Sequence, residues 1–206
     1  MKIYPDENGR EGKGILFVIS SPSGGGKSTI AKRLIASLSG IVLSISHTTR
    51  EPRQGEVDGS DYHFVSVEEF ERIRREGGFV EWAEVHGRSY GTGRKEIDRI
   101  TGAGKDALLD IDVQGGQQIR ERFPEAILVF VVPPERDELE RRLRKRGTES
   151  PEQINRRLAA EVDELALIPY YDYAIRNDNL EDAFHAMRSI VTAERCRVSR
   201  RATNEV

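Results

Sequence analysis

The chain has 206 residues, a length that suffices for one domain with mobile sub-regions but hardly for two independent domains. Its 32 Lys and Arg nearly balance its 35 Asp and Glu, so we expect no long-range attraction to nucleic acid or membrane, and a small soluble ligand fits better. The single cysteine, Cys196, excludes an internal disulfide and a cysteine-based zinc site, and the four histidines lack metal-ligand spacing. A polar N-terminus without a signal-peptide core, and no apolar run of membrane-spanning length, predict a cytoplasmic protein.

The first motif in the chain is a glycine-rich loop between a predicted strand and a predicted helix. The apolar run at 14–20 is typical of a buried strand. Apolar residues recur at helical spacing from Ile30 to Leu38, and Gly40 ends that pattern. Residues 21–29 between them read Ser-Pro-Ser-Gly-Gly-Gly-Lys-Ser-Thr.

We interpret this loop as a phosphate-binding loop that grips a nucleotide. Glycines let consecutive backbone N–H groups turn onto phosphate oxygens, and the following helix presents its positive N-terminus. Lys27 would reach the outer phosphates, and Ser28 would hold a magnesium ion. The alternative is a plain glycine turn. Ser21 stands where the full pattern has glycine, which questions the tightness of the turn but leaves the phosphate cradle in place.

The fold class that the apolar patterning predicts is α/β. Apolar runs at 14–20, 41–45, 107–111 and 126–132 alternate with helical patterns, as in a parallel sheet covered by helices. Two stretches interrupt this rhythm, and we predict that both are flaps inserted into the core: residues 47–95, rich in Arg, Gly and Tyr, and the charged residues 144–158. In the first flap, Ser66 and Glu69 form a capping box that opens a short helix running to Gly77, and 79–85 alternates as a strand.

The first flap carries a candidate site for a second phosphate. Arg50 and Arg53 lie three residues apart, and arginine forks suit a phosphate that must be held in one orientation. Tyr62 and Tyr90 could add hydroxyl donors to the same anion. The alternative is a solvated basic loop whose arginines pair with acidic neighbours, namely Glu51, Glu56 and Asp58.

Glu81 is a carboxylate on the strand face that we expect it to share with Phe79, Ala83 and Val85. An acid among apolar neighbours needs a partner. Guanine offers one, because its N1–H and exocyclic amino group form a paired donor edge that adenine lacks. Ser46 and Thr92 could bind the rest of the base. The alternative is a structural salt bridge, with Arg88 or a lysine as the partner.

At this point the chain resembles the guanylate kinases, the enzymes that move the terminal phosphate of ATP to GMP. The resemblance covers about residues 14 to 197 and rests on several motifs in the family's order. These motifs are Ser21-Pro-Ser-Gly-Gly-Gly-Lys-Ser28, Ser46-His-Thr-Thr-Arg-Glu-Pro-Arg53, Gly59-Ser-Asp-Tyr-His-Phe64, Glu81-Trp-Ala83, Tyr90-Gly-Thr92, Asp110-Ile-Asp-Val-Gln-Gly115 and Arg146-Gly-Thr-Glu-Ser150.

The resemblance implies one domain over 1–206 with a core of the P-loop NTPase type. Its parts would be the core at 14–46, 96–143 and 159–197, a GMP-binding flap at 47–95 and a lid at 144–158. ATP would be bound by Ser23, Gly24, Gly25, Gly26, Lys27, Ser28, Thr29 and, on the adenine side, Asn177. GMP would be bound by Arg50, Arg53, Tyr62 and Tyr90 at its phosphate, by Ser46, Glu81 and Thr92 at guanine, and by Asp112 beside them.

The remaining implied roles concern the transferred phosphoryl group. Asp110 ends the apolar run 107–111 at the carboxyl end of a predicted strand, where an aspartate can hold magnesium through water. Lys27, Arg142, Arg146 and Arg157 would surround the moving group, although 140–146 would also pass as an ordinary charged helix face. No general base is expected, since phosphoryl transfer depends on positioning and charge stabilisation. We also expect each flap to close on its nucleotide and to exclude water.

Two other functions remain open at the level of sequence. Guanylate-kinase-like domains also occur as binding modules that hold phosphopeptides without catalysis, and the chain could instead phosphorylate another small acceptor. The presence of Lys27, Ser28 and Asp110 favours an enzyme, and Glu81 favours guanine. The sequence does not separate GMP from dGMP and does not give the oligomeric state.

Overall fold

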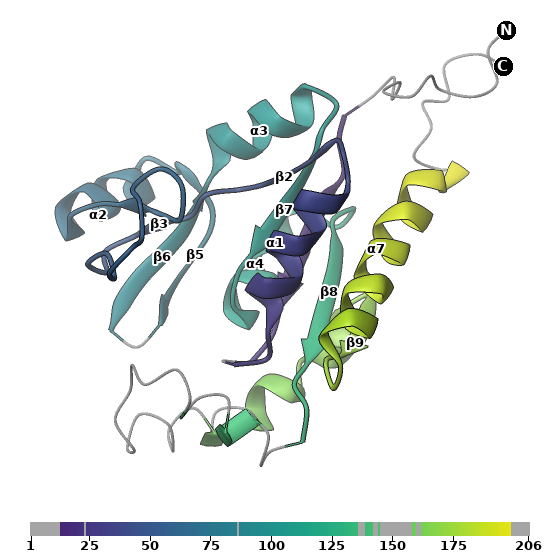
Figure 1. The fold of residues 1–206 in the computed structure, drawn as a ribbon. Helices are drawn as coiled ribbons and strands as arrows, with labels where there is room; N and C mark the ends of the chain where they lie inside the picture. The colour runs from purple at the N-terminus through teal and green to yellow at the C-terminus, as the bar shows by residue number, and fades with distance from the viewer. Residues whose placement is uncertain are drawn as a thin grey trace, which may run out of the picture.

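A parallel sheet forms the centre of the molecule (Figure 1). The structure is a computed structural model that describes residues 13–22, 24–85, 87–135, 139–141, 144, 158–159 and 162–198. The five strands lie in the order β2-β7-β1-β8-β9, and every neighbouring pair is parallel. Their bounds are β1 Leu16–Ser20, β2 Ile41–Leu43, β7 Asp106–Asp110, β8 Ile127–Val132 and β9 Tyr173–Arg176. The central β1 is buried along its whole length, as both faces of such a sheet are covered.

Helices cover both faces of this sheet. On one face, Phe17 and Ile19 of β1 pack with two helices, α1 (Lys27–Ser37) and α7 (Leu180–Cys196). On the other face, Leu16 and Val18 pack with α3 (Arg94–Gly102) and α4 (Val113–Arg122). The alternation of β1 between the two clusters confirms the predicted α/β fold.

A second, smaller sheet forms the flap and stands beside the core (Figure 1). Its order is β4-β3-β6-β5, with β3 parallel to β4 and antiparallel to β6, and β5 antiparallel to β6 at one edge. Its strands are β3 His47–Thr48, β4 His63–Phe64, β5 Phe79–Val85 and β6 Arg88–Gly93.

Helix α2 (Val67–Arg75) packs on one face of the flap sheet through Phe70, whose ring lies 4.6 Å from that of Phe79. It begins at Ser66, whose Oγ accepts a hydrogen bond of 3.2 Å from the N–H of Glu69, so the predicted cap is confirmed. The helix ends two residues before Gly77, which takes a left-handed conformation with φ 67°.

Strand β9 was missed by the sequence analysis, and the structure does not describe most of the predicted lid. Strand β9, at the edge of the sheet, was not predicted, because only Ile175 of its four residues is buried. Residues 145–157, most of the predicted lid, lie outside the described residues.

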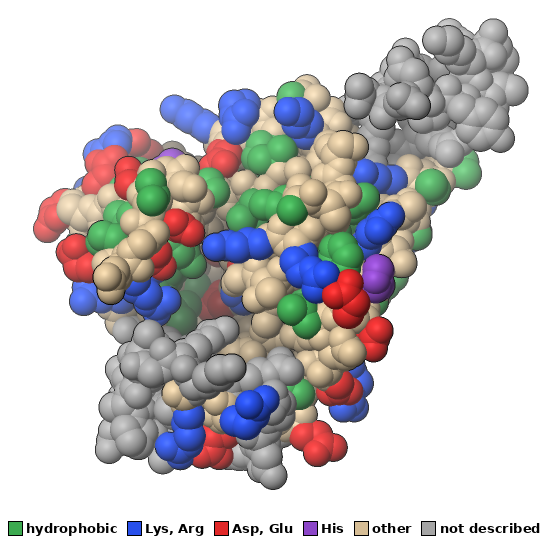
Figure 2. Space-filling model, in the orientation of Figure 1, with side chains coloured by type: hydrophobic (Ala, Val, Ile, Leu, Met, Phe, Trp, Pro, Cys, Tyr) green, Lys and Arg blue, Asp and Glu red, His purple; other side chains and the backbone are tan. Residues whose placement is uncertain are grey.

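Basic and acidic side chains are interspersed over the face in Figure 2, which fits the balanced charge of the chain. No helix in the described parts of the chain is long and apolar enough to cross a membrane.

Candidate active site

The glycine-rich loop joins β1 to α1 at the carboxyl edge of the parallel sheet. Gly24 and Gly26 have φ of 91° and 92°, a conformation that other residues rarely adopt. A Cβ on Gly25 would lie 1.7 Å from the Oγ of Ser21, so a side chain at this position would displace the Ser21 hydroxyl. The loop therefore has the backbone that a phosphate cradle requires, in front of the N-terminus of α1.

Two side chains hold the loop from within. Ser21 is buried and its Oγ donates to the carbonyl of Pro22 at 2.9 Å, while Gly25 N–H bonds the same carbonyl at 3.0 Å. Asn177, at 2% exposure, donates from Nδ2 to the Gly25 carbonyl at 2.6 Å. Ser21 thus leaves the turn tight, and the structure places Asn177 against the loop backbone, behind the predicted phosphate site.

Lys27 lies in the first turn of α1, and its ammonium contacts the carboxylate of Asp110, the last residue of β7. The Nζ to Oδ1 distance is 2.6 Å. Burial alone would lower the pKa of Lys27, but the charge and hydrogen bond of Asp110 outweigh it, and the pKa rises above its ordinary value. The structure thus brings together the two groups that sequence assigned to the phosphates and to magnesium. Ser28 and Thr29 are exposed on the same turn.

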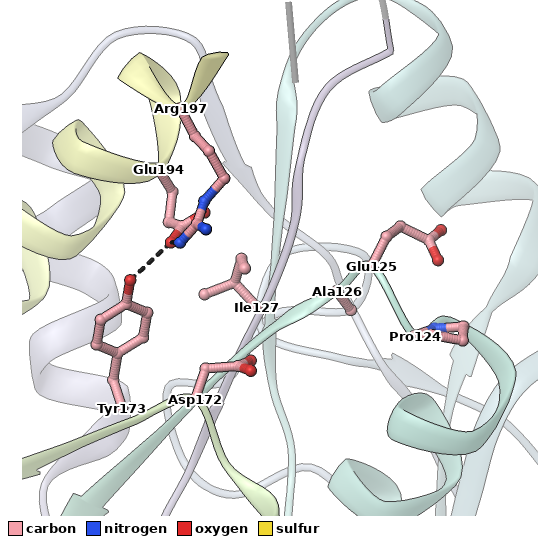
Figure 3. Close-up of a pocket in the computed structure, with 8 residues that line it drawn as sticks. All are labelled: Pro124, Glu125, Ala126, Ile127, Asp172, Tyr173, Glu194 and Arg197. Atoms are coloured by element: carbon pink, nitrogen blue, oxygen red, sulfur yellow. Dashed lines mark hydrogen bonds and ion pairs between the residues drawn. The ribbon is translucent and has the colours of Figure 1, made fainter. Parts of the chain in front are cut away.

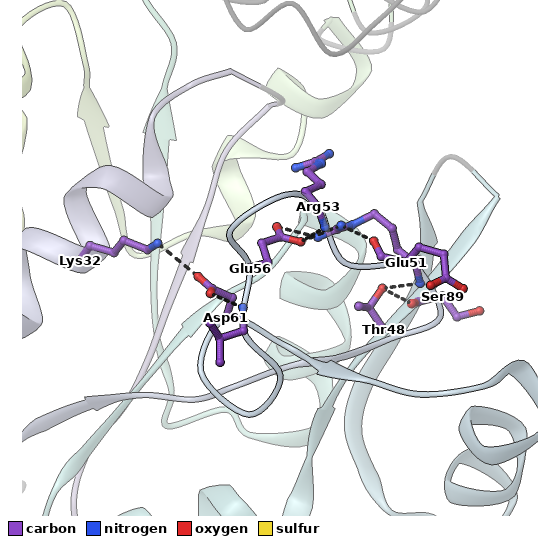
Figure 4. Close-up of polar contacts among 9 residues, drawn as sticks. Lys32, Thr48, Glu51, Arg53, Glu56, Asp61 and Ser89 are labelled. Carbon is purple, nitrogen blue, oxygen red and sulfur yellow. Dashed lines mark hydrogen bonds and ion pairs between the residues drawn. The ribbon is translucent and has the colours of Figure 1, made fainter.

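In the flap, the guanidinium of Arg50 is engaged by a neighbouring carboxylate. It donates to both oxygens of Glu56 at 2.9 Å, and the backbone N–H of Arg53 donates to Glu56 Oε2 at 2.7 Å (Figure 4). These hydrogen bonds hold the pKa of Glu56 below its ordinary value. The ion-paired loop considered as an alternative is therefore present, and a phosphate at this site would meet an arginine already oriented by Glu56.

The two tyrosines of the predicted phosphate site lie with Arg50. The Tyr62 and Tyr90 ring centres are 6.0 Å apart in an edge-to-face arrangement, and the Arg50 guanidinium lies 5.3 Å from the Tyr62 ring centre. The side chain of Arg53 is exposed. Three of the four residues that we predicted to bind this phosphate thus lie together. The fourth, Arg53, lies on the same loop as Arg50.

Glu81 lies buried in the flap, at 3% exposure, and is linked to both other residues predicted to bind guanine. Thr92 donates to its Oε1 at 2.6 Å, and Ser46 Oγ lies 3.4 Å from Thr92 Oγ1. Among the described residues no cation forms an ion pair with Glu81, so the salt bridge considered as an alternative is not found there. Burial, opposed in part by Thr92, raises the pKa of Glu81 to about 7.

The expectation that Glu81 shares a strand face with Phe79 was wrong, and a β-bulge is the reason. Phe79 pairs with Gly93, and Glu81 pairs with Thr92, the neighbour of Gly93 on β6. Two steps along β5 therefore match one step along β6, and Val80 is the extra residue. The bulge directs Phe79 toward α2 and the Glu81 carboxylate toward Thr92. Alternation cannot predict a face across such an insertion.

Asp112 is the N-cap of α4, and its charge helps to raise the pKa of Glu81. Its Oδ1 accepts from the N–H of Gly115 at 2.9 Å, and burial raises its pKa. A Cβ on Gly115 would lie 2.5 Å from Glu81 Oε2, so the first turn of α4 passes close to the Glu81 carboxylate. Sequence reasoning gave no role to Gly115 or to the rest of α4, because the closeness of this helix to β5 has no local signal.

Several predicted site residues lie outside the described residues: Ser23 in the loop, Arg142 just before the predicted lid, and Arg146 and Arg157 within it. A separate hollow of about 570 Å³ lies at the opposite, amino-terminal edge of the sheet, where β8 and β9 begin (Figure 3). Its buried carboxylate, Glu194, accepts hydrogen bonds from Tyr173 and Arg197. Because ligands of open α/β sheets bind at the carboxyl edge, we place the active site at the loop and the flap. Figure 2 shows the surface hollowed between flap and core.

Comparison with known proteins decides the family. The guanylate kinase family matches residues 13–194. The chain belongs to the guanylate kinase family. A guanylate kinase of Caldanaerobacter subterraneus subsp. tengcongensis is 46% identical over 91% of this chain and 91% of its own, and one of Dechloromonas aromatica is 50% identical over 87% and 89%. The crystal structure of guanylate kinase from Anaplasma phagocytophilum, 34% identical, covers 94% of this chain and 92% of its own, with a TM-score of 0.79. This kinase is therefore an ATP:GMP phosphotransferase of nucleotide metabolism.

Proposed function

We propose that the phosphate loop of this kinase binds ATP, that the flap binds GMP or dGMP, and that the terminal phosphate passes between them. The observation that carries the division is Glu81, a buried carboxylate that accepts a hydrogen bond from a hydroxyl and forms no ion pair with a described cation. A guanine edge with two N–H donors supplies what this carboxylate lacks, and adenine does not. The cluster of Arg50, Tyr62 and Tyr90 would then receive the GMP phosphate.

On the ATP side, the proposed ligands are the loop and the start of α1. The N–H groups of Gly24, Gly25 and Gly26 would contact the phosphates, as would Lys27. The described residues contain no cluster of three or more metal-ligating side chains, which suits magnesium, an ion that keeps several waters and the substrate's own phosphates. Ser28 and Asp110 offer the oxygens that it prefers, and magnesium would neutralise charge on the phosphates.

The chemistry proposed for the protein is positioning and charge stabilisation. Lys27 would turn from Asp110 to the transferred group, because the 2.6 Å ion pair and a phosphate contact compete for one ammonium. Arg142, Arg146 and Arg157, in and just before the predicted lid, remain proposals for contacts with the transferred group. No residue needs to act as a general base, since the GMP phosphate is already an anionic nucleophile. We place the reaction in the purine metabolism of the cytoplasm, with no nucleic acid or membrane partner.

A coupled assay for ADP release tests the proposal, with ATP and magnesium and with GMP, dGMP, AMP, UMP or CMP as the acceptor. We expect strong turnover with GMP and dGMP and little with the others. Turnover with another nucleotide would overturn the role of Glu81. Silence across the panel, together with measurable GMP binding, would instead indicate a binding module.

A further inference from the structure

Strand β5, which carries Glu81, has an open edge, and that edge faces α4. The flap sheet ends at β5, so every second residue of the strand directs its N–H and C=O away from β6. Such groups must find partners when they are covered. On either side of Glu81 the partners are side chains of α4, a helix of the core.

Gln118 takes the place of a neighbouring strand at Trp82. Its Nε2 donates to the Trp82 carbonyl at 2.6 Å, and its Oε1 accepts from the Trp82 N–H at 3.2 Å. One primary amide thus satisfies both backbone groups of one residue, as a paired strand would. On the other side of Glu81, Arg122 Nη1 donates to the Val80 carbonyl at 2.7 Å.

These contacts come from one stripe of α4. Gly115, Gln118 and Arg122 are separated by three and four residues, so they share a helix face. Gly115 leaves room for the Glu81 carboxylate, and the two longer side chains fix the backbone before and after it. The same helix begins at Asp112, two residues after Asp110, the partner of Lys27.

We propose that Gln118 is a positioning residue for guanine recognition, and that together with Arg122 it sets the orientation of the Glu81 carboxylate relative to the phosphate loop. The proposal rests on the assignment of Glu81 to the base. A carboxylate that must accept two parallel hydrogen bonds tolerates little rotation of the strand that carries it, because both bonds weaken as they bend. Gln118 contacts no substrate in this scheme and acts through β5.

The test compares Gln118→Met, which keeps the length of the side chain and removes both hydrogen bonds, with Gln117→Met. Gln117 is the matched control, since it is half-buried on the same helix and its side chain forms none of the hydrogen bonds found among the described residues. For Gln118→Met we expect the GMP KM to rise about tenfold, the size of one or two lost hydrogen bonds, with kcat and the ATP KM nearly unchanged. The preference for GMP over inosine monophosphate, which lacks the exocyclic amino group, should fall as well. Equal rises in the GMP and ATP KM, or no rise in either, would overturn the proposal.

A double-mutant cycle with Glu81→Gln tests the role of Gln118 separately from the proposed reading of guanine by Glu81. If Gln118 acts through Glu81, then Gln118→Met changes the GMP KM by less than about twofold in the Glu81→Gln background, because coupled residues are not additive. Additive effects would mean that Gln118 acts elsewhere. A normal GMP KM for Glu81→Gln alone would instead remove the base-reading assignment, whatever Gln118 does.

Arg122 provides a second, exposed position, so the proposal stays testable if Gln118→Met does not fold. Arg122→Met should raise the GMP KM in the same direction, and Arg122→Lys, which keeps the charge and a donor for the Val80 carbonyl, should restore it. If neither substitution of Arg122 changed the GMP KM, the proposed role of this face of α4 would be contradicted.

Discussion

Glu81 combines burial, a raised pKa and a proposed role that requires ionisation. Because guanine donates two hydrogen bonds to the carboxylate, GMP binds the ionised form. With the pKa of Glu81 raised to about 7, we predict that GMP affinity falls as the pH drops below 7, approaching roughly tenfold per pH unit. Calorimetric titration between pH 6 and pH 8 measures this. The GMP phosphate titrates in a similar range, so Glu81→Gln is the control, and an identical pH slope in that variant would contradict the prediction.

The same ionisation acts on folding with the opposite sign. A carboxyl whose pKa is higher in the folded than in the unfolded protein keeps its proton up to a higher pH when folded. The free energy of unfolding therefore falls as the pH rises from 4.5, the ordinary pKa of the carboxyl, to about 7, its pKa in the folded protein. At pH 8 the cost is on the order of 3 kcal/mol. Ligand-free Glu81→Gln should therefore resist urea better than the unsubstituted protein at pH 8 while binding GMP more weakly. Function at this residue opposes stability.

Lys27 offers a residue-scale test of the two-site division. We predict that Lys27→Ala lowers kcat by orders of magnitude, because the developing charge on the transferred group loses its ammonium partner. GMP affinity should remain largely intact, since the proposed GMP contacts lie in the flap. Turnover assays and calorimetry with GMP on one preparation check both halves. An equal loss of GMP affinity would contradict the division.

At the scale of elements, the phosphate loop depends on a residue more than 150 positions away in the sequence. Asn177 follows β9 and donates to the carbonyl of Gly25. We predict that Asn177→Leu, which leaves that buried carbonyl without this donor, weakens ATP binding by about 1–3 kcal/mol. Inorganic tripolyphosphate should lose affinity by a similar factor, because the substitution affects the phosphate loop and tripolyphosphate has no adenine.

The contrast between ATP and tripolyphosphate decides between two roles for Asn177. If its side chain contacts adenine, as the family resemblance implies, the substitution weakens ATP and spares tripolyphosphate. Its 2% exposure and its bond to the loop favour the bracing role. GMP affinity serves as the internal control for folding and should not change.

The elements also show what the sequence could predict. Long apolar runs located four of the five core strands, including the strand end at Asp110, and the glycine-rich motif located the loop between β1 and α1. The assignment of Ser46, Glu81 and Thr92 to guanine stays a prediction. Strands β3 and β4, two residues each, are too short to show a period, and β9 is mostly exposed. The bulge at Val80 and the hydrogen bonds from Gln118 and Arg122 of α4 to β5 could not be predicted, because they depend on which elements meet in space. The Arg50–Glu56 pair is local to one loop, and the sequence offered it as the alternative interpretation of the flap arginines.

At the scale of the whole molecule, the flap is fastened to the core unevenly. One side is held by Gln118 and Arg122 of α4, and β6 runs directly into α3 at Gly93 and Arg94. On the far side, a 3.6 Å ion pair with partly exposed side chains joins Lys32 of α1 to Asp61, which lies in the same loop as Arg50 (Figure 4). Such exposed pairs contribute little, so the clamped side should act as the hinge.

We therefore predict that the flap closes on GMP by rotating about the β5–α4 contact, which brings Arg50 toward the phosphate loop. Spin labels at exposed Ser60 in the flap and Ser189 on α7, in a Cys196→Ser background, should approach each other when GMP and a non-hydrolysable ATP analogue bind. A control pair at Arg99 on α3 and Ser189 should keep its distance, because both positions belong to the core. Unchanged distances in both pairs would mean a rigid flap. Water would then have to be excluded by the lid alone, since a rigid flap leaves the GMP side of the transferred group open.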